Sequence, residues 1–433
     1  MGRIKRLVAI TLAAMTLFCV VAQSVLADEA DMITVSLRVE GIKENMYYKE
    51  GIRIAAGSTV EALLKHASDA DSALTVKITN SEHGAYISEI NGLAEFALGE
   101  MSGWNYRVND TAPAYGISQY ELESWDTVVC YFGDPYGAGM QYPQADWSRI
   151  LSEGIIKFSS IDAEYDEFWA LSLNDNPVVG AKVTFRWDSY VTDINGEITI
   201  NDKTGLSGYR PLQIERYDEA TGAPTALRFA PGFEIYVPFA DTPHETWQAW
   251  YEDAVRFCVR KEYFVGTNLA ANLFEPSRNM TMAQLVTVLA RIGNVDTDLT
   301  TGDLWYDAPL DWAVNNGILS GVSDAVINEG IGALYELTSG MNVTREEFIH
   351  MFYLTVRLVG SADMNVRADI STASDYGDIT KDYLESISWA VASGIIKGTA
   401  PGSLIISPKL EVNRATVCQM IHNYYTTTVT TAN

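Results

Sequence analysis

Three copies of one segment fill the C-terminal part of this 433-residue chain, beginning near Thr246. In each copy a tyrosine is followed by an aliphatic residue at offset 4, a small residue at offset 7 and a valine at offset 8. This spacing places the four side chains on one face of a helix. The copies are Tyr251–Val259, Tyr306–Val314 and Tyr383–Val391. The repeat predicts helical units that bury their apolar faces by stacking on one another.

A second helix is predicted in each copy, and capping residues mark its start. Thr281 with Gln284, and Thr344 with Glu347, have the spacing of a capping box, in which each side chain accepts a backbone amide that the helix leaves free. Asn413 can cap the third helix without such a partner. A glycine follows each first helix, seven residues past the valine, at Gly266, Gly321 and Gly398.

These features resemble the S-layer homology family, whose pattern combines a Gly-Ile-x-x-Gly segment, a Phe-x-Pro loop and a Thr-Arg-Ala-Glu helix start. The matching segments are Gly317-Ile318-Leu319-Ser320-Gly321, Gly394-Ile395-Ile396-Lys397-Gly398, Phe274-Glu275-Pro276, Ile406-Ser407-Pro408, Thr344-Arg345-Glu346-Glu347 and Asn413-Arg414-Ala415-Thr416. The resemblance implies an all-α pseudo-trimer of repeats at 243–295, 300–360 and 374–428. It also implies inter-repeat grooves that bind secondary cell wall polysaccharide, in this family often carrying a pyruvate ketal.

Two arginines are the main candidates for glycan binding. Arg345 and Arg414 occupy the first helical position, where a cation opposes the helix dipole, so a local rule is broken twice at equivalent places. A ligand carboxylate there would gain both a guanidinium and the free amides of the helix start. The alternative is that each arginine pairs with a surface carboxylate. Copy one has Met282 instead, so we expect two competent sites and one degraded site.

Five further residues are candidates in the same grooves. Gly321 and Gly398 either end a helix in left-handed geometry or let the backbone approach the sugar; the two roles are compatible. Lys397 adds a cation to the third loop. Trp305 either stacks on a sugar ring or packs within the helices. Arg291 matches a basic position of the family and would compensate in part for Met282.

The N-terminal part of the chain predicts three more segments. Residues 1–27, with basic residues followed by an apolar run, have the pattern of a secretory signal peptide. Residues 31–135 alternate apolar and polar positions around a helix at 59–67, which predicts a small α+β domain. Residues 155–240 predict a β-sandwich domain with strands at 181–187, 197–200, 212–216 and 233–237.

The 31–135 domain resembles the domain of unknown function related to the C-terminal domain of transcobalamin. The match rests on a Gly57-to-Val60 helix entry, Gly84-Ala85-Tyr86-Ile87, Ile90-Asn91-Gly92 and Gly103-to-Asn109. The carriers' helical partner domain is missing here, so vitamin binding is not carried over, and Trp104 and Tyr106 are predicted core aromatics. The 155–240 domain resembles β-sandwich spacers of bacterial surface proteins, with Asp193–Gly196 as a hairpin turn rather than a calcium loop.

Composition excludes several classes of function. The chain has 30 Lys and Arg against 56 Asp and Glu, a net charge of −26, which becomes −29 once Arg3, Lys5 and Arg6 leave with the signal peptide. Such a charge disfavours nucleic acid and anionic membranes. No apolar run long enough to span a membrane follows the signal segment. Once the signal peptide, with Cys19, is removed, Cys130, Cys258 and Cys418 are too few for a disulfide framework. Cys258 and Cys418 fall on apolar helix faces, where buried free thiols are expected rather than a disulfide or a nucleophile.

No catalytic or metal-binding motif is evident, and the five histidines lack metal-ligand spacing, so the sequence predicts neither an enzyme nor a cofactor. The favoured hypothesis is a noncatalytic protein secreted to the cell wall or S-layer of a bacterium with a thick, accessible wall, anchored through wall polysaccharide and compatible with self-assembly into a surface layer. The alternative is a wall-anchored enzyme, or a protein that binds a cobalamin-like or other small solute, acting through the N-terminal domain.

Overall fold

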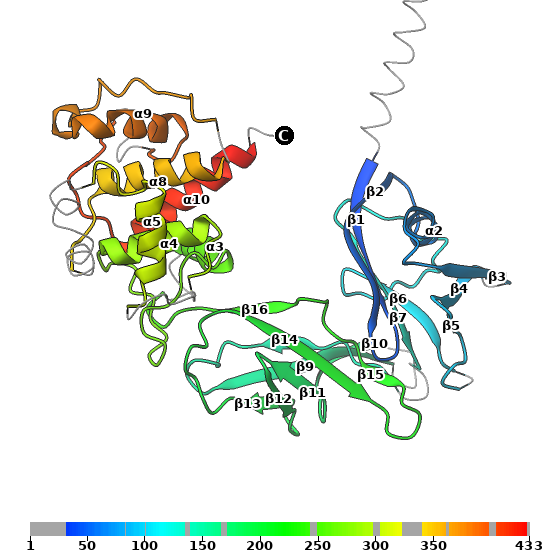
Figure 1. The fold of residues 1–433 in the computed structure, drawn as a ribbon. Helices are drawn as coiled ribbons and strands as arrows, with labels where there is room; N and C mark the ends of the chain where they lie inside the picture. Colours follow the sequence, from blue (N-terminus) through cyan, green and yellow to red (C-terminus); the bar gives the residue numbers. More distant parts are fainter. Residues whose placement is uncertain are drawn as a thin grey trace, which may run out of the picture. The chain divides into compact units, whose positions relative to one another are not determined.

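The chain is divided between β-rich N-terminal and middle regions and a helical C-terminal region (Figure 1). A computed structural model describes residues 32–82, 84–99, 101–134, 139–165, 171–242, 249–297, 304–322, 340–360, 363–397 and 404–430. Two compact units result, one built from residues 1–201 and 211–235 and the other from residues 202–210 and 236–433. The predicted signal segment 1–27 and Gly398 lie outside the described residues.

The N-terminal region is a four-stranded sheet covered by one helix. The sheet has the order β2-β1-β7-β6, with β1 and β7 parallel. A smaller sheet has the order β3-β4-β5. The elements are β1 (Met32–Glu40), β2 (Asn45–Ala55), α2 (Val60–Ala70), β3 (Val76–Ser81), β4 (Gly84–Ile90), β5 (Leu93–Ala94), β6 (Gly103–Val108) and β7 (Thr127–Gly133).

Helix α2 begins where the sequence predicts. The side chain of Thr59 caps it by accepting the amide of Ala62 at 3.3 Å. Its apolar face, with Leu63 and Leu64 fully buried, packs in one core with Leu37 and Val39 of β1. The alternation of β1 thereby places Arg38 and Glu40 on the opposite face of the sheet.

The middle region contains two sheets. One has the order β10-β9-β13 with β8 paired to β9, and the other has the order β12-β11-β14-β15 with β16 paired to β14. The strands are β8 (Gln144–Asp146), β9 (Ile155–Tyr165), β10 (Leu171–Pro177), β11 (Lys182–Phe185), β12 (Asp188–Val191), β13 (Glu197–Thr199), β14 (Gly208–Tyr217), β15 (Pro224–Ala226) and β16 (Glu234–Val237). Four of them, β11, β13, β14 and β16, lie where strands were predicted.

The segment Asp193–Gly196 is a turn stabilised by its own side chain. The Asp193 carboxylate accepts the amides of Asn195 at 2.9 Å and Glu197 at 2.8 Å. Gly196 has φ of 74°, and a Cβ there would lie 2.3 Å from the carbonyl oxygen of Phe158. Only glycine fits this position, which supports the interpretation of a turn.

Among the described residues, the C-terminal region contains three pairs of helices. The first helices are α3 (Glu252–Arg260), α5 (Asp307–Asn315) and α9 (Leu384–Ala392), and the second are α4 (Met282–Ile292), α8 (Arg345–Val359) and α10 (Arg414–Thr430); η1 (Tyr376–Asp378) and η2 (Lys381–Tyr383) precede α9. Their shared core contains Phe348, Phe352, Trp389 and Tyr424. The predicted helix face is correct at offsets 0, 4 and 7 in every copy except for half-buried Tyr251. The valine at offset 8 lies at the margin of the buried helix face, and Val314 is 40% exposed.

The three second helices start as predicted. Thr281 with Gln284 and Thr344 with Glu347 form complete capping boxes, and the Asn413 side chain accepts the amide of Thr416 at 2.9 Å.

The segments before these caps form a closed ring of backbone hydrogen bonds. Val343 donates to Met280 at 3.0 Å, Met280 donates to Val412 at 2.9 Å, and Val412 donates back to Val343 at 2.9 Å. Each of these residues stands one position before its capping residue. The three helix entrances therefore meet in cyclic order, although about 60 to 70 residues of sequence separate one from the next.

Candidate functional site

The two arginines predicted to bind glycan have different surroundings. Arg414 is the first residue of α10 and is 5% exposed. Its Nε donates to the carbonyl oxygen of Phe274 at 2.7 Å, and a terminal nitrogen donates to that of Val265 at 2.6 Å. Its guanidinium also lies 4.4 Å from the centre of the Phe274 ring. Arg414 thus fastens α10 to the loop of the first copy.

Burial affects the charge of Arg414 as well. Desolvation lowers the pKa of Arg414 to about 10, and neighbouring acidic groups only partly oppose this. The guanidinium is still charged at neutral pH, but carbonyl oxygens already satisfy two of its nitrogens. The alternative expected from sequence, a pair with a surface carboxylate, does not describe Arg414.

Arg345, the first residue of α8, has no comparable partners. It is half-buried, and its Nε is buried without any hydrogen-bond partner. Burial lowers the pKa of Arg345, while the charge of Asp375 acts in the opposite direction. The Asp375 carboxylate accepts the amide of Ile406 at 3.1 Å and also that of Ser407. Arg345 is therefore a cation at the junction of the second and third copies with an unsatisfied donor.

The helix-start amides are not free, which corrects the sequence prediction. In α8 the amides of Arg345 and Glu346 donate to the carbonyl oxygens of Leu410 at 2.8 Å and Pro408 at 3.0 Å. In α10 the amides of Arg414 and Ala415 donate to carbonyls of the first copy in the same way. The accepting carbonyl groups belong to segments distant in sequence, so the local pattern at a helix start does not predict these bonds. An anion at either helix start would have to depend on side chains.

Gly321 belongs to a loop that is held from two sides. Its φ of 78° is left-handed, but α5 ends at Asn315, so the helix-ending position belongs to Gly317, with φ of 66°. The Tyr383 hydroxyl of the third copy donates to the Gly321 carbonyl oxygen at 2.8 Å. The Nε2 of His350 lies 2.9 Å from the Ser320 carbonyl oxygen, and burial lowers the pKa of His350.

The other predicted site residues have different surroundings from one another. Trp305 is 53% exposed, with its ring edge-on to Tyr306, which favours the stacking interpretation over burial among the helices. Lys397 is exposed. Arg291 donates to Thr297 at 3.2 Å and to the Tyr263 carbonyl oxygen at 3.4 Å, so it binds within the first copy.

The sequence pattern did not identify one charged residue next to Arg345. Glu346 is 3% exposed and accepts the Thr380 amide at 3.0 Å and the Thr380 hydroxyl at 2.7 Å, and it forms an ion pair with Lys409. The other copies have alanine at this position, Ala283 and Ala415. A glutamate at a repeat position that holds alanine in the other two copies is the sequence feature that could have identified Glu346.

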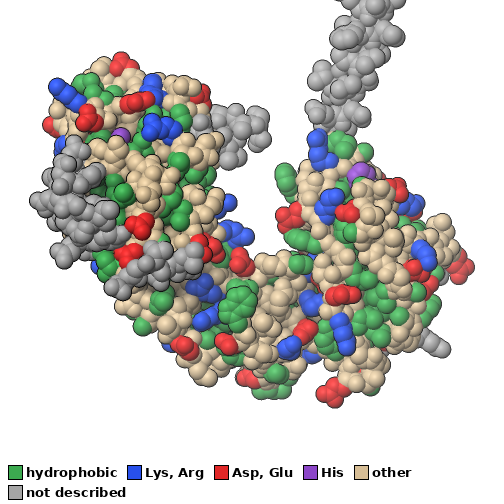
Figure 2. Space-filling view, in the orientation of Figure 1, with side chains coloured by type: hydrophobic (Ala, Val, Ile, Leu, Met, Phe, Trp, Pro, Cys, Tyr) green, Lys and Arg blue, Asp and Glu red, His purple; other side chains and the backbone are tan. Residues whose placement is uncertain are grey.

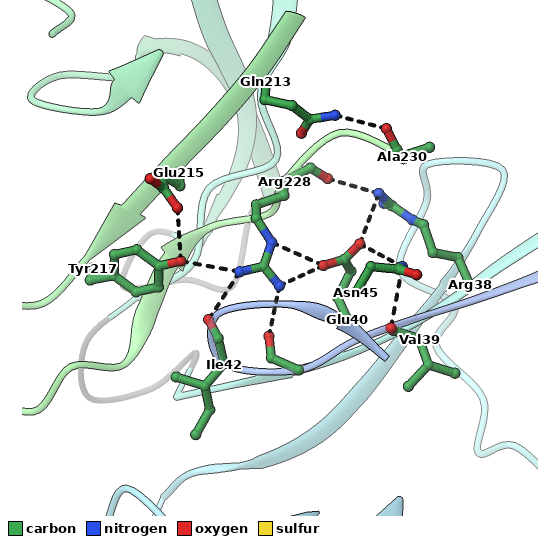
Figure 3. A network of polar contacts seen from close by, with 11 residues as sticks. Arg38, Val39, Glu40, Ile42, Asn45, Gln213, Glu215, Tyr217, Arg228 and Ala230 are labelled. Atoms are coloured by element: carbon green, nitrogen blue, oxygen red, sulfur yellow. Dashed lines mark hydrogen bonds and ion pairs between the residues drawn. The ribbon is translucent and has the colours of Figure 1, made fainter. Parts of the chain in front are cut away.

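A second charged cluster lies in the β-rich unit (Figure 3). The Glu40 carboxylate, 3% exposed, accepts Arg228 at 2.6 and 3.0 Å and lies 3.5 Å from Arg38. Arg228 also donates to the Tyr217 hydroxyl at 3.1 Å and to carbonyls of the β1–β2 hairpin, including Ile42 at 3.2 Å. The cluster joins β1 to the β14–β15 region.

A cavity of about 510 Å³ lies beside this hairpin. Its lining is Gly41, Ile42, Lys43, Glu44, Met46, Leu93, Leu98, Thr221 and Gly222. Most of these side chains are apolar, and the segments come from three separate parts of the unit.

The described residues contain no cluster of three or more His, Cys, Asp or Glu side chains arranged to hold a metal ion. In the same part of the chain, no helix combines the length and apolar character that a membrane crossing requires. Cys130, Cys258 and Cys418 are all buried. On the face drawn in Figure 2, the Lys and Arg side chains of the described residues are interspersed with Asp and Glu.

Two family models match parts of the chain. Residues 374–418 match the S-layer homology domain, and residues 57–134 match a domain of unknown function, DUF4430. The chain therefore carries a C-terminal S-layer homology domain and an N-terminal DUF4430 domain. The S-layer homology domain implies a surface protein anchored to the cell wall. No curated protein matches it.

Two solved structures share a limited likeness. Haptocorrin in complex with Cbi is 17% identical over 24% of this chain and 25% of its own, with a TM-score of 0.22. A putative metal binding protein from Ruminococcus gnavus ATCC 29149 is 9% identical over 24% of this chain and 99% of its own, with a TM-score of 0.20. This chain thus spans about a quarter of haptocorrin.

Proposed function

We propose that this protein is a noncatalytic secreted surface protein that binds secondary cell wall polysaccharide through its C-terminal repeats and displays its N-terminal domains outward. The observation that carries the proposal is Arg345, a cation with an unpartnered buried nitrogen beside the matched S-layer homology domain. The expected localisation is the wall of a bacterium whose polysaccharide is accessible from outside.

The chemistry of Arg345 favours an anionic sugar. Burying an unpaired hydrogen-bond donor costs about 1 to 3 kcal/mol, and more for a charged group. A ligand carboxylate would remove this cost and form a charge-assisted pair with the guanidinium. A pyruvate ketal on the polysaccharide would supply such a carboxylate. Exposed Trp305 of the second copy and Lys397 of the third copy are further candidates for sugar contacts.

Arg414 contributes differently in this proposal. Its nitrogens are already bound to the carbonyls of Val265 and Phe274, so an incoming carboxylate would have to displace two good hydrogen bonds. The first copy also lacks an arginine at Met282. We therefore assign one strong glycan site, at the junction of repeats two and three, in place of the two expected from sequence.

We also propose a pseudo-trimer of repeats at 243–295, 300–360 and 374–428. Two observations support it. The ring of hydrogen bonds through Met280, Val343 and Val412 has the cyclic order that three related units produce. Each first helix packs on the second helix of the previous copy, α5 on α4, α9 on α8 and α3 on α10.

The cavity beside the β1–β2 hairpin favours a second candidate function, binding of a small solute by the N-terminal domain. Its volume of about 510 Å³ and mostly apolar lining are within the usual range for small-molecule sites. Replacing Leu93 with Trp would narrow it. Loss of a solute that wild-type protein retains through desalting would support this function, whereas equal retention by both proteins would exclude this cavity.

The wall-binding proposal is tested by sedimentation with purified walls. The mature chain should pellet with intact walls and stay in solution with walls stripped of polysaccharide by acid. Stripped peptidoglycan that binds as well as intact wall would refute the glycan anchor.

A further inference from the structure

The junction between the first and third repeats differs from the other two. Helices α4 and α5, and helices α8 and α9, join copies that follow one another in the chain. The third junction, between α3 and α10, brings together residues 160 positions apart, such as Cys258 and Cys418. No short connection holds this junction closed, so it depends on packing and on hydrogen bonds such as those that Arg414 donates to Val265 and Phe274.

Two cysteines face each other at this junction. Cys258 of α3 and Cys418 of α10 are both 0% exposed. The Cys258 thiol donates to the Cys418 carbonyl oxygen at 3.7 Å and is also within hydrogen-bonding reach of the Cys418 thiol. The equivalent positions at the other junctions hold no sulfur: they are Ala313 with Val286, and Ala390 with Ile349.

The simplest alternative is that both cysteines serve as small apolar residues. That role explains one cysteine well, because alanine fills the Cys258 position in the other copies. It does not explain why the partner in contact is also cysteine, or why both occur at the junction without chain continuity. The third cysteine, Cys130, lies in the other compact unit and has no such partner at hand among the described residues.

We propose that Cys258 and Cys418 form a disulfide that covalently closes the three repeats. The oxidant is a small-molecule or protein disulfide met outside the cytoplasm. One thiolate attacks it, forms a mixed disulfide and releases one thiol; the second thiolate then attacks the mixed disulfide and releases the other thiol. The two cysteines lose two protons and two electrons, and the oxidant is reduced to two thiols.

Burial determines when this exchange occurs. The thiolate is the reactive form, and burial raises the pKa of Cys258. Neither sulfur is reachable once α3 has packed on α10. The bond therefore forms while the exported chain folds, and the folded, reduced protein resists oxidation.

The test uses the mature chain, reduced and unfolded, then refolded in a mixture of reduced and oxidised glutathione. Free thiols are alkylated under denaturing conditions and located by mass spectrometry. We expect alkylation at Cys130 alone and a peptide pair joined through Cys258 and Cys418. Cys130→Ser should leave the cross-link unchanged, and Cys418→Ser should abolish it. Reducing the cross-linked protein should lower its melting temperature by roughly 10 °C, as expected for a bond that closes a long loop.

Three results would overturn the proposal: alkylation of all three cysteines after refolding, Cys130 in the cross-link, or disulfides that join separate chains. The outcome does not depend on polysaccharide, so wall binding by fully reduced protein would leave the proposed anchoring function standing.

Discussion

Removing Arg228 should destabilise the β-rich unit far more than removing an exposed cation of the same unit. In Arg228→Met, the Glu40 carboxylate loses its bonds at 2.6 and 3.0 Å, and keeps Asn45 at 2.9 Å and Arg38 at 3.5 Å. Because the Glu40 side chain is 3% exposed, water cannot replace the lost partner. Breaking one side of a buried ion pair costs about 3 to 5 kcal/mol.

Lys182→Met is the matched control. Lys182 pairs with Glu215 at 2.8 Å, a similar distance, but its side chain is 56% exposed and that of Glu215 is 32% exposed. An exposed pair contributes about 0.2 to 1 kcal/mol. The double variant Glu40→Gln/Arg228→Met should recover part of the loss, because a neutral amide needs less compensation than a buried carboxylate.

Hydrogen exchange with mass spectrometry on peptides of β1 and β7 measures the free energy of opening of this unit within the intact chain. Arg228→Met should lower that free energy several times more than Lys182→Met. Equal losses in the two variants, or a double variant no better than Arg228→Met, would refute the claim that Glu40 is a buried, compensated charge.

Three further predictions concern the repeats. Burial holds the pKa of His350 in the folded protein below its unfolded value of 6.5, so the unfolded chain binds protons more readily and stability falls as the pH drops below 6.5. His350→Gln should therefore flatten the dependence of melting temperature on pH in this range. An unchanged slope would contradict this prediction. Thr344→Ala removes a capping box, so it should lower the free energy of opening of α8, measured by hydrogen exchange, by about 1 kcal/mol. An unchanged free energy of opening would mean that the Thr344 side chain does not stabilise the helix start. Trp305→Ala should change the free energy of unfolding by no more than about 0.5 kcal/mol and should weaken glycan binding. Trp250, 64% exposed, lies in the copy whose second helix starts with Met282 in place of an arginine, so Trp250→Ala should leave glycan binding unchanged; equal affinities of the two variants would exclude Trp305 as a stacking platform.

The repeats were the most predictable part of the fold, because their signals are local. The caps at Thr281, Thr344 and Asn413 depend on residues three positions away, and all three were identified correctly. The predicted face was least accurate at offset 8: Val259 and Val391 are partly buried against the core, but Val314 is not. The valine lies four residues after the aliphatic residue at offset 4, which places its side chain near the edge of the buried helix face. Val314 is therefore exposed to solvent.

The site was less predictable because identical motifs meet different neighbours. Arg345 and Arg414 have the same position in their helices. The carbonyls that satisfy Arg414 come from a loop about 140 to 150 residues earlier, whereas Arg345 has no such bonds. Repeat patterns show which residues are equivalent, but they do not show which partners each equivalent residue meets.

The charged cluster in the β-rich unit illustrates the same limit. Alternation along β1 placed Arg38 and Glu40 opposite the core, which sequence patterns associate with solvent. Here that face is covered, and Arg228, 188 residues from Glu40, completes the cluster. A polar strand face covered by another region carries no distinct local signature.

A comparison of Arg345→Gln with Arg357→Gln tests whether Arg345 is the cation that recognises wall polysaccharide. Both arginines lie on α8, but Arg357 is exposed in the last turn. Affinity for purified, pyruvylated wall polysaccharide is measured by calorimetry at fixed salt. We expect Arg345→Gln to lose at least about tenfold in affinity, near 1.4 kcal/mol, and Arg357→Gln to bind like wild type. Equal binding by all three proteins would contradict this expectation.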